Sequence, residues 1–157
     1  MITNYLENNY LVLVGKITSD KKFSHEIYGE SFYVFNLEVP RLSQTSDIIP
    51  ITISERLLIN FDLTIGKEVE IEGQFRSYNA YENERSRLVL TVFAKEIREK
   101  EAEVEQDITE GEEETTKPIK VSNEVVLIGY ICKKPIYRKT PFGREISDIL
   151  LAINRAY

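Results

Sequence analysis

An internal repeat with a fixed offset of 114 residues constrains this chain more than any other feature. Residues 9–15 (NYLVLVG) align with residues 123–129 (NEVVLIG), and the register holds without a gap for about 33 positions. A fixed period indicates one structural unit that occurs twice. Chance similarity between two β-rich segments explains the match poorly, because polar, glycine and apolar positions all keep register. The further matches are Ile17 with Ile131, Tyr28-Gly29 with Phe142-Gly143, Phe35, Leu37 and Val39 with Ile149, Leu151 and Ile153, and Arg41 with Arg155.

The repeat predicts the organisation of the chain. We expect a complete first copy over residues 1–98, an acidic linker over 99–121 and the N-terminal part of a second copy over 122–157. An equal second copy would extend to about residue 212, so the sequence predicts a truncated one. Its sheet edge would invite pairing with another chain. The linker has the composition of a solvated segment, although Ala, Glu and Lys favour a brief helix within 94–106.

Alternating apolar residues predict an all-β first copy. Strands are expected at 10–17, 31–39, 48–53, 67–75 and 88–97, with a polar loop at 77–87. Ser54 is a suitable N-cap for a short helix over 55–61. Three strands, a short helix and two strands form the order of the OB-fold, a five-stranded barrel. An SH3-type barrel is the alternative, but it usually has no helix at that place. The second copy would supply two strands, at 125–131 and 145–153.

Charge is unevenly distributed along the chain. The net charge of −6 includes −8 from residues 99–114, while residues 1–98 carry −3 and residues 115–157 carry +5. The positive C-terminal segment is therefore compatible with a polyanionic partner in spite of the acidic total.

Other features bear on location and chemistry. No apolar run approaches the roughly 20 residues that span a bilayer, and the N-terminus lacks the pattern of a secretion signal. The single Cys132 cannot form an internal disulfide and suits a reducing cytoplasm. His25 has no Cys or carboxylate pattern beside it, which argues against a metal site. No arrangement typical of a nucleophile, a phosphate loop or paired carboxylates stands out, so we expect neither catalysis nor a cofactor.

Two clusters combine cations with aromatic residues, as binding of a single nucleic-acid strand requires. The first joins the two strands of the second copy and contains no acid: Lys133, Lys134, Tyr137, Arg138, Lys139, Phe142 and Arg144. The second lies at the end of the fourth strand and in the loop after it, diluted by two glutamates: Arg76, Tyr78, Tyr81, Arg85 and Arg87. Solvated polar hairpins are the alternative interpretation of both clusters.

Three further candidates lie near the ends of the second strands: Arg41, Arg155 and Tyr157. An arginine at a strand end is often only a surface residue, which is the alternative here. Phe35, Leu37, Ile149 and Leu151 are expected in the cores of the two copies, since they follow the apolar alternation.

Several segments resemble the bacterial single-stranded-DNA-binding (SSB) family. In the second copy they are residues 123–129, Pro135, 140–143 (TPFG) and 152–155 (AINR), and in the first copy residues 66–77, GKEVEIEGQFRS. The resemblance implies a sequence-tolerant binder of single-stranded DNA in replication, recombination or repair. It also implies an assembly with four OB domains, which a tandem chain would reach as a dimer when full length, with replication or repair proteins as partners.

The chain also departs from that family. The family stacks bases on aromatic residues that include several Trp, whereas this chain has no Trp, and its acidic strip is internal. The alternative is therefore an OB-fold module for protein interaction or oligomerisation, with little DNA binding of its own.

Overall fold

The structure is a computed structural model that describes residues 8–100 and 123–155. The chain divides into two compact units. The larger one is Leu11–Glu124, and the smaller one combines Met1–Tyr10 with Val125–Tyr157. The predicted domain boundaries at residues 98 and 122 stay a prediction.

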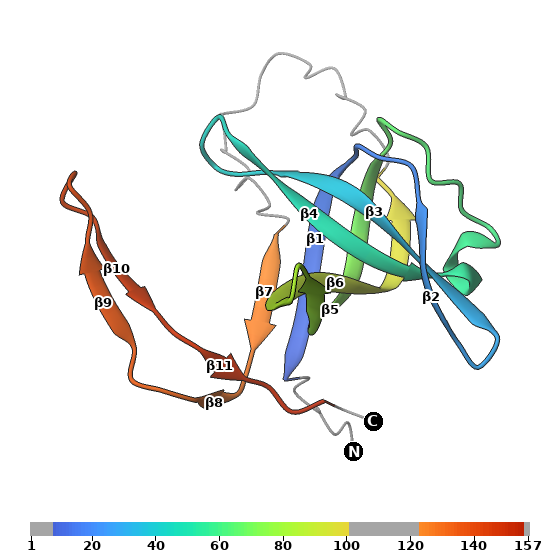
Figure 1. The fold of residues 1–157 in the computed structure, drawn as a ribbon. Coiled ribbons are helices and arrows are strands. Elements are labelled where there is room, and N and C mark those ends of the chain that lie inside the picture. Colours follow the sequence, from blue (N-terminus) through green and yellow to red (C-terminus); the bar gives the residue numbers. More distant parts are fainter. Residues whose placement is uncertain (1–7, 101–122, 156–157) are drawn as a thin grey trace, which may run out of the picture. The chain divides into compact units, whose positions relative to one another are not determined.

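Six strands and one turn of 3₁₀ helix build the larger unit (Figure 1). The sheet order is β2-β3-β4-β6-β5-β1, and β1 also pairs with β3, so that the sheet partly closes into a barrel. All of these pairings are antiparallel except β4 with β6, which is parallel. The elements are β1 (Asn9–Ile17), β2 (Lys22–Ile27), β3 (Glu30–Pro40), β4 (Ser46–Ser54), η1 (Glu55–Leu58), β5 (Glu68–Glu82) and β6 (Arg85–Glu99).

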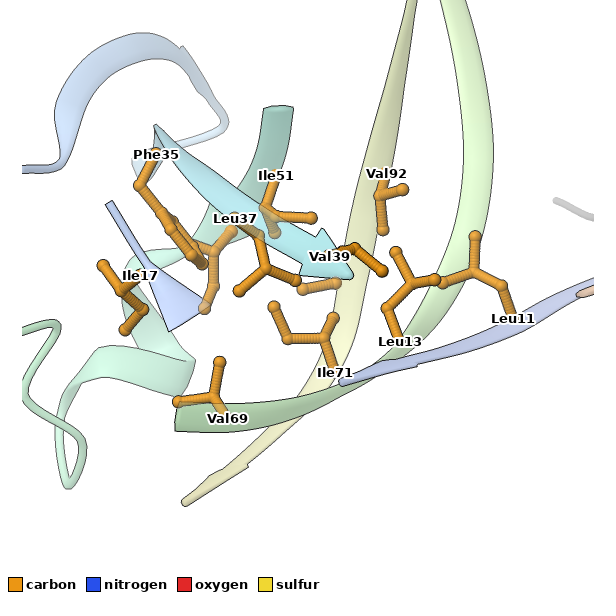
Figure 2. Close-up of a cluster of buried hydrophobic side chains, with 12 residues drawn as sticks. Leu11, Leu13, Ile17, Phe35, Leu37, Val39, Ile51, Val69, Ile71 and Val92 are labelled. Atoms are coloured by element: carbon orange, nitrogen blue, oxygen red, sulfur yellow. The ribbon is translucent and has the colours of Figure 1, made fainter. Parts of the chain in front are cut away.

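The core follows from the period-two alternation of the strands, because successive side chains point to opposite faces of a sheet. Phe35 and Leu37, which the sequence assigned to the core, are buried together with Ile51, Ile71 and Val92. In Figure 2 the buried side chains of β1, β3, β4, β5 and β6 point toward one another. The opposite face of the same strands is therefore free to carry other chemistry.

Two strand predictions for the larger unit were incomplete. Residues 22–27, which lie between two of the expected strands, form β2 and pair with the start of β3. Residues 77–87, expected as a polar loop, continue β5 and β6 as one long hairpin. Its turn is at Asn83 and Glu84, both with positive φ (50° and 62°), as the type I′ turns that suit twisted hairpins require.

The helix predictions were partly wrong. The helix expected at 55–61 is a 3₁₀ turn over Glu55–Leu58, although Ser54 caps it as predicted and accepts a hydrogen bond from the Arg56 N–H at 3.2 Å. Residues 94–99, where a helical continuation was expected, belong to β6 because they pair with β5 as far as Glu99. The remainder of that expected helix, 101–106, lies outside the described residues.

The C-terminal segment contains β7 (Glu124–Leu127), β8 (Tyr130–Ile131), β9 (Ile136–Lys139), β10 (Glu145–Asp148) and β11 (Leu151–Ala152). Each of the two predicted strands is thus split into two short ones. The pairings of β8 with β11 repeat those of β1 with β3 at the offset of 114: Ile131–Leu151 and Tyr130–Ala152 match Ile17–Leu37 and Lys16–Glu38.

Hydrogen bonding repeats in the same way. The Cys132 N–H donates to the Leu150 carbonyl at 3.0 Å, and the Thr18 N–H donates to the Asn36 carbonyl at the same distance. Positions 18 and 36 become 132 and 150 at the offset of 114. The repeat is therefore one of backbone pairing as well as of sequence.

Burial does not repeat between the copies. Ile149 is 57% exposed and Ile131 is 61% exposed, whereas the matching Phe35 and Ile17 are almost fully buried. The expectation that Ile149 is a core residue was wrong for this structure, and Leu151 is half-buried. The reason is that β4, β5 and β6, which cover the core of the first copy, have no counterparts among the described residues of the C-terminal segment.

Gly15 and Gly129 occupy matching positions where two backbones approach closely. A Cβ on Gly15 would collide with the carbonyl oxygen of Glu38, and a Cβ on Gly129 with that of Ala152. These carbonyls belong to the strand segments that pair with β1 and β8, so glycine is required where the two strands close.

We predict that Gly15→Ala lowers the free energy of unfolding by about 1–3 kcal/mol, the usual cost of forcing an extra carbon into a packed site. Chemical denaturation of the full chain measures it. Gly29→Asn is the control, because Gly29 has a φ of 81° and open space around it, a conformation that Asn tolerates. Equal stability of Gly15→Ala and the native chain would contradict the steric argument.

Candidate nucleic-acid interface

A row of flat side chains crosses the outer face of the barrel. His25 of β2 stacks on Phe32 of β3, with ring centroids 4.8 Å apart and planes within 9°. Phe32 contacts Phe93 of β6 at 5.7 Å between centroids. The guanidinium of Arg76 on β5 lies over the Phe93 ring, 4.0 Å from its centroid. We call these four residues the stacking row.

Alternation along the strands places the stacking row. By alternation, Phe32 and Phe93 lie on the face opposite the core cluster. Phe32 is nonetheless buried, at 8% exposure, with His25 stacked on its ring, and Phe93 is half-buried. The parallel pairing of Thr52 with Phe93 and the antiparallel pairing of Phe32 with Ser54 bring the two rings together across β4. The row therefore depends on contacts between residues far apart in the sequence.

Polar side chains beside the row are satisfied within the protein. The hydroxyls of Thr52 and Thr91 are 2.9 Å apart, and the Thr91 hydroxyl also contacts the Pro50 carbonyl at 3.2 Å. Both threonines are buried. The two threonines therefore find their hydrogen-bond partners within the protein, as buried polar groups usually do.

Arg76 is held in a defined orientation. With the Gln74 amide turned to satisfy both partners, its oxygen accepts from Nε and Nη2 of Arg76 at 3.0 and 2.7 Å. The guanidinium is thus fixed by Gln74 at its edge and by Phe93 at its face. A planar cation held in this way presents both charge and a stacking surface.

The second predicted cluster divides between the two faces of the β5–β6 hairpin. Arg76, Tyr78, Arg85 and Arg87 pair with Thr91, Val89, Glu82 and Ala80, which places them on the outer face with the stacking row. Tyr81 pairs with Ser86 and points to the opposite face. Four of the five predicted residues are therefore brought together on the outer face, and Tyr81 is not one of them.

The first predicted cluster lies on β9, β10 and their connections. Tyr137 and Lys139 share one face of β9, and Arg138 lies on the other, where it forms an ion pair with Asp148 at 3.0 Å. Phe142 is at the tip and is 97% exposed. Lys133, Lys134 and Arg144 are also exposed, so all seven side chains are accessible to solvent, although they are divided between the two faces of this hairpin.

The β2–β3 hairpin of the first copy and the matching β9–β10 hairpin of the second differ in register. β2 carries an irregularity between Phe23 and His25, and its two-residue turn is at Tyr28 and Gly29, both with positive φ. β9 and β10 pair without a shift from Ile136–Asp148 to Lys139–Glu145, and a longer turn follows. Both hairpins have the same length, so the first copy gains a bulge and the second a wider tip.

Charged side chains in and beside the β2–β3 hairpin have partners within the protein. Lys21 lies over the Tyr33 ring, with Nζ 4.7 Å from its centroid. The Glu30 carboxylate accepts a hydrogen bond from the Ser54 hydroxyl and forms an ion pair with Arg56 at 3.3 Å. The positive charge near the stacking row is therefore modest compared with that of the β9–β10 hairpin.

The remaining predicted residues are outside both groups. Arg41 forms two hydrogen bonds to Asp47 at 2.6 and 2.8 Å in the connection between β3 and β4. These hydrogen bonds lower the pKa of the Asp47 carboxyl and raise the pKa of Arg41. Arg155 is exposed and interacts with another group of the protein. Tyr157 lies outside the described residues.

His25, Phe32 and Phe93 were missed by sequence reasoning. His25 was considered only as a possible metal ligand, and neither Phe32 nor Phe93 was among the predicted binding residues. Period-two alternation contained a signal for Phe93, which lies between the core residues Val92 and Ala94, and a weaker one for Phe32, which precedes the partly buried Tyr33. Nothing in the sequence indicated that β2, β3 and β6 would bring the three rings together.

The described residues contain neither a candidate metal site nor a candidate membrane-spanning helix. No group of three or more His, Cys, Asp or Glu residues is arranged to hold a metal ion within 8–100 and 123–155. Over the same residues, no helix has the length and apolar character to cross a membrane.

Comparisons with solved structures place this fold. The dimeric N-terminal domain of the PriB protein from Thermoanaerobacter tencongensis is 54% identical, with a TM-score of 0.52, and the match covers 59% of this chain and 97% of that domain. A scan against protein-family models finds no match, and neither does a search of curated proteins.

Two structures of the single-stranded DNA binding protein from Thermus aquaticus share the fold at lower identity. The wild type matches at 18% identity with a TM-score of 0.65, and a deletion variant at 19% with 0.61. Each match covers 93% of this chain, and 68% or 69% of the Thermus chain. That coverage extends past the barrel into the C-terminal residues.

The barrel with its outer stacking row is thus an OB-fold of the kind found in single-strand-binding proteins, and the predicted all-β OB-fold is confirmed. The chain belongs to the bacterial SSB and PriB family of OB-fold proteins.

We predict that Arg41→Gln raises the titration midpoint of the Asp47 carboxyl toward its ordinary value of about 4, as measured by carboxyl NMR. In the native chain the lowered pKa means that the pair contributes to stability above the unfolded pKa. That contribution is lost as the pH falls through the folded pKa. An unchanged midpoint in Arg41→Gln would show that Arg41 is not the cause.

Proposed function

We propose that this protein binds single-stranded DNA with little sequence preference and without catalysis. The observation that carries the proposal is the stacking row, in which four flat side chains of four different strands lie on one outer face. Every base has a π-face, so stacking on such a row tolerates any sequence. The exposed His25 and the half-buried Arg76 lie at its two ends, where bases have access.

Phosphate binding is assigned mainly to the β9–β10 hairpin and its flanks. Lys133, Lys134, Arg138, Lys139 and Arg144 are all exposed, and Tyr137 and Phe142 between them offer further stacking surfaces. Arg85 and Arg87 on the outer face of the β5–β6 hairpin add charge beside the stacking row. Affinity from such contacts falls steeply with salt, because bound cations are released from the strand.

The comparisons support the class of ligand. The Thermus aquaticus proteins are single-stranded DNA binding proteins by name, and the PriB domain was solved as a dimer. By analogy we assign this chain to replication, recombination or repair in the cytoplasm, as a homo-oligomer that contacts other proteins of those processes. The proposed organisation is a first OB-fold over 1–98, a linker over 99–121 and part of a second OB-fold over 122–157.

An acidic surface on the first barrel favours the alternative function, a protein-interaction module. Glu70 and Glu72 of β5 and Glu96 of β6 surround Arg98, whose nitrogens lie 3.0, 3.3 and 2.7 Å from their carboxylates. The hydrogen bond to Glu70 is the main cause of the raised pKa of Arg98. Nucleic acid would be repelled by such a surface, whereas a basic protein partner would not.

We predict that Arg76→Ala and Phe93→Leu each weaken binding to an oligo-thymidine strand by about tenfold, the effect expected when one stacking contact is lost. Arg76→Lys should recover only part of the loss, because it restores charge without a planar face. Arg98→Ala is the matched control, since it removes one positive charge from the acidic surface. Fluorescence anisotropy measures all four variants. Equal affinities for Arg76→Ala and Arg98→Ala would remove the stacking row from the proposal.

A second prediction concerns salt. Replacing Lys133, Lys134 and Lys139 with Ala should reduce the slope of log K against log salt by up to about 0.7 per lost contact, the value for single strands. The titration uses oligo-thymidine and a duplex of equal length at several salt concentrations. An unchanged slope would exclude the β9–β10 hairpin from phosphate binding. If the native chain binds neither strand nor duplex, the protein-interaction module becomes the better proposal.

A further inference from the structure

The tip of the β2–β3 hairpin, which projects from the barrel (Figure 1), carries an aromatic side chain that no contact within the protein explains. Tyr28 is fully exposed, at 105% of its reference area. Among residues 8–100 and 123–155, its ring contacts no other ring and no cation, and its hydroxyl has no hydrogen-bond partner. Packing therefore gives no reason for a tyrosine at this position.

The backbone conformation at Tyr28 is unfavourable for tyrosine. Tyr28 has a φ of 49° and Gly29 a φ of 81°, which is the pattern of a two-residue type I′ turn with Asn-Gly as its preferred pair. A large side chain in the left-handed region is crowded by its own backbone, whereas Asn and Gly tolerate that region. Strain of this kind is found mainly at functional sites, so the tyrosine at the tip indicates a function.

The second copy has an aromatic residue at the matching tip. The offset of 114 equates Tyr28-Gly29 with Phe142-Gly143, and Phe142 is also almost fully exposed. The two turns differ, because only the glycine has a positive φ within residues 140–144. An exposed ring followed by glycine is thus common to both tips although the turn geometry is not, so the geometry of the turn does not account for the ring.

We propose that Tyr28 is a second site on the first barrel at which a nucleic-acid base stacks, an inference that rests on the function proposed above. The site lies on the same hairpin as one end of the stacking row. His25 pairs with Phe32, and two further residue pairs separate them from the turn. At roughly 3.3 Å per strand residue, Tyr28 is about 10 Å along the hairpin from His25. A few nucleotides of a strand bound to the row can span that distance.

Charges near the tip favour stacking over phosphate binding. Glu26 and Glu30 lie within two residues of the turn, and the Glu30 carboxylate is paired with Arg56 at 3.3 Å. This tip therefore offers a phosphate no concentration of cations, in contrast to the five cations between residues 133 and 144. Stacking involves the uncharged base and needs no cation. A contact at Tyr28 should thus add affinity without adding to the salt dependence.

Tyr28→Asn separates the role of the ring from that of the turn. Asn suits the left-handed conformation, so the melting temperature should rise by a few degrees. Affinity for oligo-thymidine should fall by about five- to tenfold, as expected for the loss of one stacking contact. The slope of log K against log salt should equal that of the native chain. Calorimetry and fluorescence anisotropy at several salt concentrations measure these effects, and a variant that is more stable yet binds more weakly has not lost affinity by unfolding.

Two variants serve as controls. Tyr28→Phe keeps the ring and should bind within about twofold of the native chain. Tyr81→Asn makes the same replacement at an exposed ring that points away from the stacking row, and it should leave the affinity unchanged. Unchanged affinity in Tyr28→Asn, or an equal loss in Tyr81→Asn, would overturn the proposal and leave the tip to a protein partner.

The same titrations distinguish this inference from the function on which it rests. If Arg76→Ala weakens binding and Tyr28→Asn does not, the stacking row is supported and only the site at the tip is wrong. If the native chain does not bind oligo-thymidine at any of the salt concentrations, both proposals are wrong.

Discussion

The structure depends on the closure of β1 against β3. Closure requires that the backbone of Gly15 lies against the Glu38 carbonyl, which leaves no room for a side chain. Once Ile17 is paired with Leu37, the apolar residues of β1, β3 and β5 face one interior. The outward residues of β3, β4 and β6 then form a continuous outer surface. The stacking row exists because this surface brings Phe32 and Phe93 together.

Period-two alternation made much of the first barrel predictable. Phe35, Leu37 and the cap at Ser54 were found from sequence because their signals are local. β2 was missed because all of its residues are exposed, so no apolar pattern marked it. Residues 77–87, the outer part of the β5–β6 hairpin, were taken for a loop because its turn, Asn83-Glu84, contains no glycine. The stacking row was not predictable, since it arises from pairings between distant strands.

The two copies differ in burial and in charge. The first copy has a complete core and a row of rings supported by satisfied threonines. The C-terminal segment repeats the backbone pairing of β1 and β3 but leaves Ile131 and Ile149 exposed, and it carries the stronger positive charge. In the proposed function, stacking and phosphate binding therefore belong mainly to different parts of the chain.

The bulge in β2 affects how the copies should be compared. The offset of 114 equates His25 with Lys139, yet His25 is paired with Phe32 while Ile146, the counterpart of Phe32, is paired with Arg138. The register shift in β2 changes which side chain meets its cross-strand neighbour, although the sequences of the two copies align without a gap. Structurally equivalent residues in the two copies are therefore identified by their hydrogen-bonded pairing. A gapless sequence alignment can equate residues that occupy different structural positions.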